Sequence, residues 1–331
     1  MIIKNIGELG RFSGMAVVIA LFFALHISIG AKAIPLADVF SALIARDDTI
    51  FDHIVVWDLR MPRAVIAIVV GAALAVSGAL MQGITRNPLA DPGLLGLLAG
   101  ASFAVVVAFG IWGSAIVPIM PLVAAGGALA AAGLVLWIAT AAPGGARPLT
   151  LILAGAAISA FLGAVIAAVQ LLDQENFDQL RVWLTGTISG HRMSYMGWCL
   201  PWLAVGFVAA FAVARQITSL AMGDDVAVGL GVNVVQVKIV SLIAVVTLTA
   251  SAVTLSGPLG FIGLVIPHVV RLFVGTDYRF VVPYSALVGA AYLLFVDIIA
   301  RVALAPVEIS TGLVTSLLGA PFFVWLVRAK L

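Results

Sequence analysis

The sequence predicts an all-α membrane protein with ten transmembrane helices. Of its 331 residues, 63% are hydrophobic and 10% are charged, whereas a soluble domain carries about a quarter charged residues. A soluble chain this apolar could not cover its surface with polar groups. The apolar residues also form long continuous runs instead of alternating with polar ones, and this pattern favours spanning helices over a closed barrel.

Ten apolar runs approach the roughly 20 residues that a helix needs to cross a bilayer. In chain order they are 13–30, 62–83, 94–111, 115–139, 149–172, 197–214, 233–255, 259–274, 281–303 and 311–328. The run at 259–274 is short and follows Ser256-Gly257-Pro258, so we expect a half-helix or re-entrant element there. Small residues recur inside the runs, as in Gly71-Ala72-Ala73, and they let helix backbones approach closely.

The first run also has features of a signal peptide, because Lys4 and Arg11 precede it and Ala31-Lys32-Ala33 resembles a cleavage site. Since the run is long enough to span, we favour a retained helix. Ten spans place both termini on one side, and the basic residues at both ends indicate the cytoplasm. No connection is long enough to hold a soluble domain, so the sequence predicts a single transmembrane domain over residues 1–331.

Several classes of function find no support in the residue pattern. The chain has no phosphate-binding loop of the G-x-x-x-x-G-K-[ST] type, so we expect no ATPase site of its own. Its four histidines are far apart in sequence, which argues against a histidine zinc site. Because Cys199 is the one cysteine, the chain cannot form an internal disulfide. The net charge of +2 without a basic stripe argues against nucleic acid as a partner. A membrane enzyme would need a convergent polar constellation, and the sequence indicates none.

Three arginines stand at the predicted outer ends of spans, against the positive-inside tendency. Arg60 and Arg63 bracket the start of the second span, and Arg301 ends the ninth. One interpretation is that they reach lipid headgroups, with Asp58 or Glu308 as partners. The other is that they form a dock for an acidic surface of another protein.

A buried ionisable residue would be typical of a secondary transporter, which is the main alternative from another class. Asp297 is almost the only such residue in the runs. It precedes Arg301 by four residues, the favourable order for an ion pair on one helix. We therefore favour structural pairing over an ion-relay role for Asp297.

Two predicted cytoplasmic connections have more polar and turn-forming residues than a plain connection needs. The segment 86–93 (RNPLADPG) contains two prolines and a glycine, which indicate a rigid turn. The segment 219–232 (SLAMGDDVAVGLGV) is amphipathic and too polar to span. With Asp224 and Asp225 at the start of a helical turn, it favours a short helix lying at the membrane surface and available to a partner.

These features together resemble a known family. The stretches that carry the resemblance are 59–102 (LRMPRAVIAIVVGAALAVSGALMQGITRNPLADPGLLGLLAGAS), 254–279 (TLSGPLGFIGLVIPHVVRLFVGTDYR) and 311–328 (TGLVTSLLGAPFFVWLVR). They are similar to the iron-chelate/vitamin B12 permease family of bacterial ABC importers, that is, to FecCD-type transmembrane subunits. The resemblance is collinear and covers nearly the whole chain.

The resemblance implies one half of a dimeric ABC importer pore in the bacterial inner membrane, with ten helices and both termini cytoplasmic. A second permease subunit, expected to be an identical copy, would complete the pore. Two cytoplasmic ATPase subunits and one periplasmic substrate-binding protein would complete the importer. The chain itself would be no enzyme and would bind no cofactor, since ATP and Mg would be used by the ATPase partner.

The resemblance also assigns roles to residues. It places docking of the binding protein on Arg60, Arg63 and Arg301, and the cytoplasmic gate at Asn87 and Leu89. It places ATPase coupling on the segment at about 216–232, on residues Ser219, Met222, Gly223, Asp224, Asp225, Gly229, Leu230 and Gly231.

The substrate is less closely defined, because ferric siderophore, haem and cobalamin permeases share these motifs. The segment 179–190 (QLRVWLTGTISG) is more similar to siderophore permeases than to the vitamin B12 branch. We therefore expect a ferric siderophore, with haem as the second candidate and cobalamin as the third.

Overall fold

The computed structural model describes residues 2–30, 32–143, 145, 148–172, 183–188 and 194–330. Within these ranges the regular secondary structure is entirely helical, which confirms the predicted all-α class for the described part of the chain. The segment 179–190, which favoured siderophore permeases, lies outside the described residues except for 183–188.

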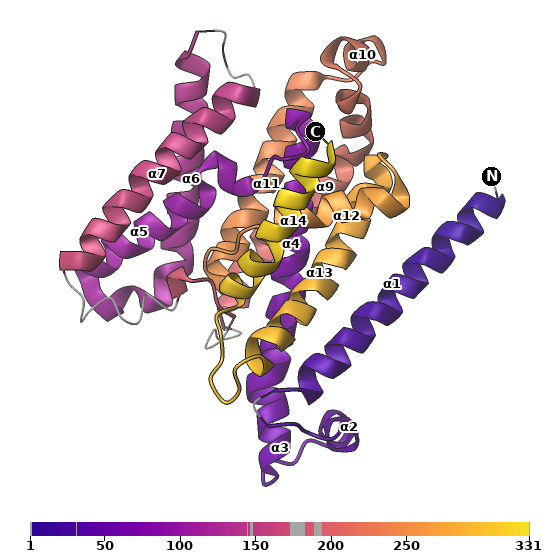
Figure 1. Cartoon of the computed structure of the whole chain (residues 1–331), viewed down its shortest axis with the longest axis vertical. Coiled ribbons are helices and arrows are strands. Elements are labelled where there is room, and N and C mark those ends of the chain that lie inside the picture. Colours follow the sequence, from indigo (N-terminus) through magenta and orange to yellow (C-terminus); the bar gives the residue numbers. More distant parts are fainter. Residues whose placement is uncertain are drawn as a thin grey trace.

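Figure 1 shows the order of the helices along the chain. Their bounds are α1 (Ile2–Ser28), α2 (Leu36–Ile44), α3 (Phe51–Ile54), the π-helix η1 (Val55–Arg60), α4 (Met61–Thr85), the 3-10 helix η2 (Pro92–Leu95), α5 (Leu97–Trp112), the 3-10 helix η3 (Gly113–Ile119), α6 (Met120–Ala141), α7 (Pro148–Leu172), α9 (Ser194–Ala221), α10 (Asp224–Gly229), α11 (Val234–Ser256), α12 (Ile262–Val274), α13 (Tyr278–Val302) and α14 (Thr311–Lys330).

Six helices of the described residues are long and apolar enough to cross a bilayer by length and composition. They are Phe51–Thr85, Leu122–Ala141, Leu149–Leu171, Tyr195–Ala221, Val234–Ser256 and Tyr278–Val302. Four further apolar helices are shorter: Phe12–Ser28, Leu97–Trp112, Ile262–Val274 and Thr311–Trp325. All ten correspond to predicted runs, but ten full crossings are not confirmed. The short α12 has only 13 residues, about 20 Å of helix, as expected for a half-length element.

The segment 32–61 is folded largely into short helices. It holds α2, α3 and η1. Helix α2 lies outside the apolar spans, whereas α3 and η1 belong to the long span Phe51–Thr85. The Trp57 indole donates a hydrogen bond to the Ala42 carbonyl at 2.7 Å, which ties η1 to α2. The structure therefore places a small folded cap at this end of the molecule.

Helix α4 forms the centre of the fold and packs against α9, α11, α12 and α13. It approaches two of them backbone to backbone. A Cβ atom on Gly71 would lie 2.2 Å from the Gly289 carbonyl oxygen of α13, and one on Gly78 would lie 1.9 Å from that of Gly263 in α12. Glycine at these positions is thus required by close packing, as the small residues predicted. By contrast, α7 is largely exposed along its length, which suits contact with lipid.

The molecule has two distinct ends (Figure 1). Helix α10 marks one of them, and α2 and α3 mark the other. Helix α1 begins and α14 ends in the half of the molecule that holds α10. We refer to these as the α10 end and the α2–α3 end.

Candidate functional site

The three arginines singled out in the sequence lie together at the α2–α3 end. Arg60 ends η1, Arg63 lies in the first turn of α4, and Arg301 lies in the last turn of α13. Arg60 and Arg301 are only 7% and 3% exposed. We call these three residues the arginine cluster. The structure places the three arginines at one end of the molecule and buries two of them within the chain.

Arg60 and Arg301 bind the end of α1. Arg60 donates from Nη1 to the carbonyl oxygens of Ile27, at 2.5 Å, and Ser28, at 2.7 Å, and from Nη2 to that of Lys32. Arg301 donates to the carbonyl oxygen of His26 at 2.7 Å. The last carbonyls of a helix lack intrahelical partners and carry partial negative charge, so arginine donors satisfy and stabilise them.

The fully buried carboxylate of Asp297 neutralises the cluster from within. Arg63 donates to it twice, from Nε at 2.7 Å and from Nη2 at 3.0 Å. His26 Nε2 lies 2.8 Å from the same carboxylate, and Thr311 Oγ1 donates at 2.9 Å. The expected pair with Arg301 is present at 3.5 Å, but Arg63 and His26 are the closer partners.

Arg63 has a second acidic partner nearer the surface. Its Nη1 lies 2.7 Å from Oε2 of Glu308, in the connection between α13 and α14. The Arg63 side chain is 12% exposed and that of Glu308 is 35% exposed. Asp58, the other acid considered in the sequence, pairs instead with Arg46 at 3.5 Å. Arg63 is therefore the member of the cluster that a molecule in solution can most readily approach.

The α10 end holds a second group of charged residues. Asp224, the first residue of α10, accepts from Arg86 Nη2 at 2.6 Å and from Lys238 Nζ at 2.9 Å. Arg86 directly follows α4 and Lys238 belongs to α11. One carboxylate thus joins the short helix to two long helices. The sequence indicated neither pairing, because Arg86 lies 138 residues from Asp224, and Lys238, although only 14 residues away, belongs to a different helix.

The coupling segment contains the short helix that its sequence predicts. Helix α10 lies between Gly223 and Gly231, whose φ angles of 127° and 79° suit glycine and allow sharp turns on both sides. Ser219 precedes the helix in α9, while Gly229 and Leu230 end it. The remaining predicted members are Met222, Asp224 and Asp225, and Met222 and Leu230 present exposed apolar side chains. The segment therefore has an apolar surface that is available for contact.

The predicted gate residues form a tight turn. Arg86 ends α4 in a left-handed conformation, with φ at 51°. The backbone N–H of Leu89 then donates to Asn87 Oδ1 at 2.9 Å. Asp91 Oδ1 accepts from the Gly93 backbone N–H at 2.8 Å, and burial raises the pKa of Asp91 to about 6. Because Arg86 also holds Asp224, the structure connects the gate turn to the coupling segment.

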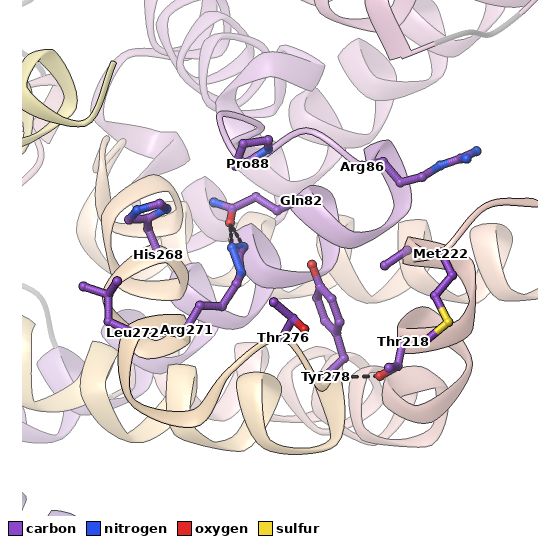
Figure 2. Close-up of a pocket in the computed structure, with 11 residues that line it drawn as sticks. Gln82, Arg86, Pro88, Thr218, Met222, His268, Arg271, Leu272, Thr276 and Tyr278 are labelled. Carbon is purple, nitrogen blue, oxygen red and sulfur yellow. Dashed lines mark hydrogen bonds between the residues drawn. The ribbon is translucent and has the colours of Figure 1, made fainter. Parts of the chain in front are cut away.

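A cavity of about 560 Å³ lies beside this group (Figure 2). The end of α4 supplies Gln82, α12 supplies Arg271, and α13 supplies Tyr278. Two N–H groups of Arg271 donate to Gln82 Oε1, one of them at 2.8 Å. Gln82 Nε2 donates in turn to the Gly263 carbonyl at 3.0 Å. Among the described residues, no group of three or more His, Cys, Asp or Glu could hold a metal ion.

The chain is similar in sequence to known transport proteins. The profile described as the FecCD transport family matches residues 17–329. The iron(3+)-hydroxamate import system permease protein FhuB of Bacillus subtilis is 42% identical over 92% of this chain and 79% of its own length. The ferric enterobactin transport system permease protein FepD of Escherichia coli is 37% identical over 96% of this chain and 94% of its own.

The chain is also similar to a permease protein named for cobalamin import and to a solved transporter structure. The cobalamin import system permease protein BtuC of Halobacterium salinarum is 39% identical over 84% of this chain and 74% of its own. A structure described as an inward-facing conformation of a metal-chelate type ABC transporter superposes with a TM-score of 0.82 at 27% identity. The superposition covers 97% of this chain and 99% of the chain in the solved structure.

Proposed function

The chain belongs to the FecCD transport family, and we propose that it is the permease subunit of an ABC importer that moves a ferric siderophore across the bacterial inner membrane. The substrate assignment is supported by the 42% identity to the iron(3+)-hydroxamate permease over 92% of the chain. Cobalamin is the second candidate, because a relative named for cobalamin import is 39% identical over 84% of the chain.

The proposed assembly contains two copies of this chain, two cytoplasmic ATPase subunits and a periplasmic binding protein. Each copy is one permease domain over residues 1–331, with ten crossings and both termini in the cytoplasm. The start of α1 and the end of α14 lie in the same half of the molecule, which supports an even number of crossings (Figure 1). The α10 end then faces the ATPases, which use ATP and Mg, and the chain itself binds no cofactor.

Helix α4 is the element that can connect the two ends. It begins beside Arg63 and ends beside Arg86, about 37 Å apart along 25 residues of helix. Closure of the ATPase pair would push α10, and the contacts of Asp224 would pass that displacement to α4 and α11. Because α4 packs against α12 and α13 through glycines, it would move as part of a rigid body. The turn at Asn87 and Leu89 would move with it and open or close the path.

Docking on the opposite side begins, in this proposal, with Arg63. It is the most accessible member of the cluster, and its outer nitrogen already holds a carboxylate, that of Glu308. A carboxylate of the binding protein would replace Glu308 and would keep the same charge-assisted geometry. Arg60 and Arg301 hold the carbonyl end of α1, so their role is to position α1 and Asp297 until the cluster opens.

The transport proposal is tested by uptake into proteoliposomes. The permease is reconstituted with its ATPase, and the binding protein is added outside with a radioactive ferric hydroxamate. We expect uptake that requires both ATP and the binding protein, and that unlabelled cobalamin does not reduce. Uptake driven by an ion gradient without ATP would instead support a secondary transporter, and competition by cobalamin would reassign the substrate.

The docking proposal is tested by binding-protein affinity for the permease in nanodiscs. Arg63→Gln should weaken binding about tenfold or more, since hydrogen bonds between charged groups contribute about 1.5–3 kcal/mol. Glu308→Gln should strengthen binding, because it removes the competing carboxylate. Arg46→Gln, a change at an exposed arginine of the same end, is the matched control and should leave affinity unchanged. Unchanged affinity in both Arg63→Gln and Glu308→Gln would refute the assignment.

A further inference from the structure

The cavity at the α10 end has the size of a small-molecule site. Its volume of about 560 Å³ lies within the range of about 300–1,000 Å³ that ligand pockets occupy. Its 11 lining residues include no Asp or Glu. They are Gln82, Arg86, Pro88, Thr218, Ala221, Met222, His268, Arg271, Leu272, Thr276 and Tyr278. The cavity therefore carries positive charge without a carboxylate in its wall.

Arg271 is the source of that charge. Arg86 also lines the cavity, but its guanidinium pairs with Asp224. Figure 2 shows that the Arg86 side chain points away from Arg271. Among the described residues Arg271 donates to the neutral Gln82, and no carboxylate there pairs with it. A guanidinium has five N–H donors. Two are used on Gln82, so three remain for a ligand.

The neighbours of Arg271 suit an oxyanion. The Tyr278 ring stands between Arg271 and Met222, and its hydroxyl points to the same side as the Arg271 guanidinium (Figure 2). Thr276 lies between Arg271 and Tyr278 and adds a second hydroxyl. An arginine with neutral hydroxyl donors beside it is the combination that recognises phosphate oxygens.

The setting of the cavity adds an apolar component. Leu272 lines it, and both Leu272 and Phe273 are exposed large hydrophobic residues that directly follow Arg271. The cavity lies where α4, α9 and α12 end and α13 begins, so it is at the boundary of the helical bundle. Basic pockets between transmembrane helices at such boundaries bind the headgroups of anionic lipids.

We propose that this cavity binds a phosphate group through Arg271, Tyr278 and Thr276. The group is carried either by the headgroup of an anionic phospholipid, with acyl chains along Leu272 and Phe273, or by a soluble phosphate. A phosphate bound there would stabilise the α10 end, because Gln82 and Arg271 link α4 to α12 at this cavity.

The test uses the full-length protein in nanodiscs of phosphatidylcholine, with and without phosphatidylglycerol. Native mass spectrometry measures retained lipid, and thermal unfolding measures Tm. The wild type should retain phosphatidylglycerol over phosphatidylcholine, and Arg271→Gln should reduce that preference about fivefold. Arg279→Gln is the matched control, because Arg279 is exposed, pairs with Asp277 and does not line the cavity.

A second arm separates the two phosphate sources. Inorganic phosphate is titrated into phosphatidylcholine nanodiscs, with sulfate-free chloride at equal ionic strength as the reference. A rise in Tm that Arg271→Gln abolishes identifies a soluble phosphate. No rise, together with retained phosphatidylglycerol, identifies the lipid. If Arg271→Gln retains the wild-type lipid preference and the wild-type phosphate response, the proposal is wrong.

Two milder variants keep the test decisive if Arg271→Gln fails to fold. Arg271→Lys keeps the charge and one donor for Gln82 but loses the planar fork. Tyr278→Phe removes only a hydroxyl, since the backbone N–H of Tyr278 keeps its bond to Thr218 at 2.9 Å. Both should fold and should weaken phosphate or phosphatidylglycerol binding by about twofold to threefold. Wild-type binding in both variants would overturn the proposal.

Discussion

Asp297 offers the sharpest test of how the α2–α3 end is held together. Its carboxylate is fully buried and accepts two hydrogen bonds from Arg63 and one from Thr311, with His26 at 2.8 Å. Asp297→Asn keeps the shape of the side chain but removes its negative charge. Arg63 and Arg301 would then face each other without a buried counter-ion.

The expected cost follows from that geometry. Removing one partner of a buried ion pair costs about 3–5 kcal/mol, because the remaining charge stays uncompensated. Thr311→Val removes a single hydrogen bond from the same carboxylate and should cost about 1–1.5 kcal/mol. Arg46→Gln breaks only exposed pairs and should leave the free energy of unfolding nearly unchanged.

The assay is reversible unfolding of the purified protein in mixed micelles, followed by circular dichroism, with the free energy of unfolding measured for all three variants. The expected order of cost is Asp297→Asn, then Thr311→Val, then Arg46→Gln. An Asp297→Asn protein within about 1 kcal/mol of the wild type would refute the reasoning. It would mean that water or a shifted protonation state compensates the cluster.

Three further predictions concern packing, coupling and pH. Gly78→Ala would place a methyl 1.9 Å from the Gly263 carbonyl oxygen and should cost about 1–3 kcal/mol in the same assay, whereas Gly163→Ala, which meets open space, should be neutral or slightly stabilising. Equal stabilities would contradict this packing. Asp224→Asn loses two partly exposed ion pairs, so stability should change by less than about 1 kcal/mol while ATP-driven uptake falls severalfold; wild-type uptake would show that these pairs do not couple. The pKa of Asp91 is raised to about 6 in the folded state, above its value of about 3.9 in the unfolded state. Between these two pH values the native state therefore binds more protons than the unfolded state. Stability should therefore fall as pH rises from about 4 to 6, and Asp91→Asn should remove that slope in unfolding measured across this pH range.

The sequence predicts features that depend on neighbouring residues. Apolar runs give the helices, and the four-residue spacing of Asp297 and Arg301 gives their pair, which the structure contains. The closer partners of Asp297 could not be predicted in this way. Arg63 and His26 lie 234 and 271 residues away, and no local pattern specifies which buried groups meet across such distances.

Burial of Arg60 shows the same limit from another side. An arginine beside a span is expected to reach water or headgroups, yet this one is buried against the carbonyl end of α1. The signal for this was present but weak: a helix that ends near residue 28 leaves acceptors without intrahelical partners. Which donors meet those acceptors depends on how α1 and η1 pack, and one sequence does not define that.

The contact between α4 and α12 can form only after both helices have been synthesised. Gln82 and the glycine that accepts its amide, Gly263, are 181 residues apart. At a synthesis rate of about 5–20 residues per second, α4 enters the membrane about ten to forty seconds before α12 exists. During that interval the Gln82 amide and the bare glycine surface lack their final partner, and a polar group in lipid is costly. Until α12 is made, α4 therefore has to remain in the membrane without the partner that satisfies this amide in the folded protein.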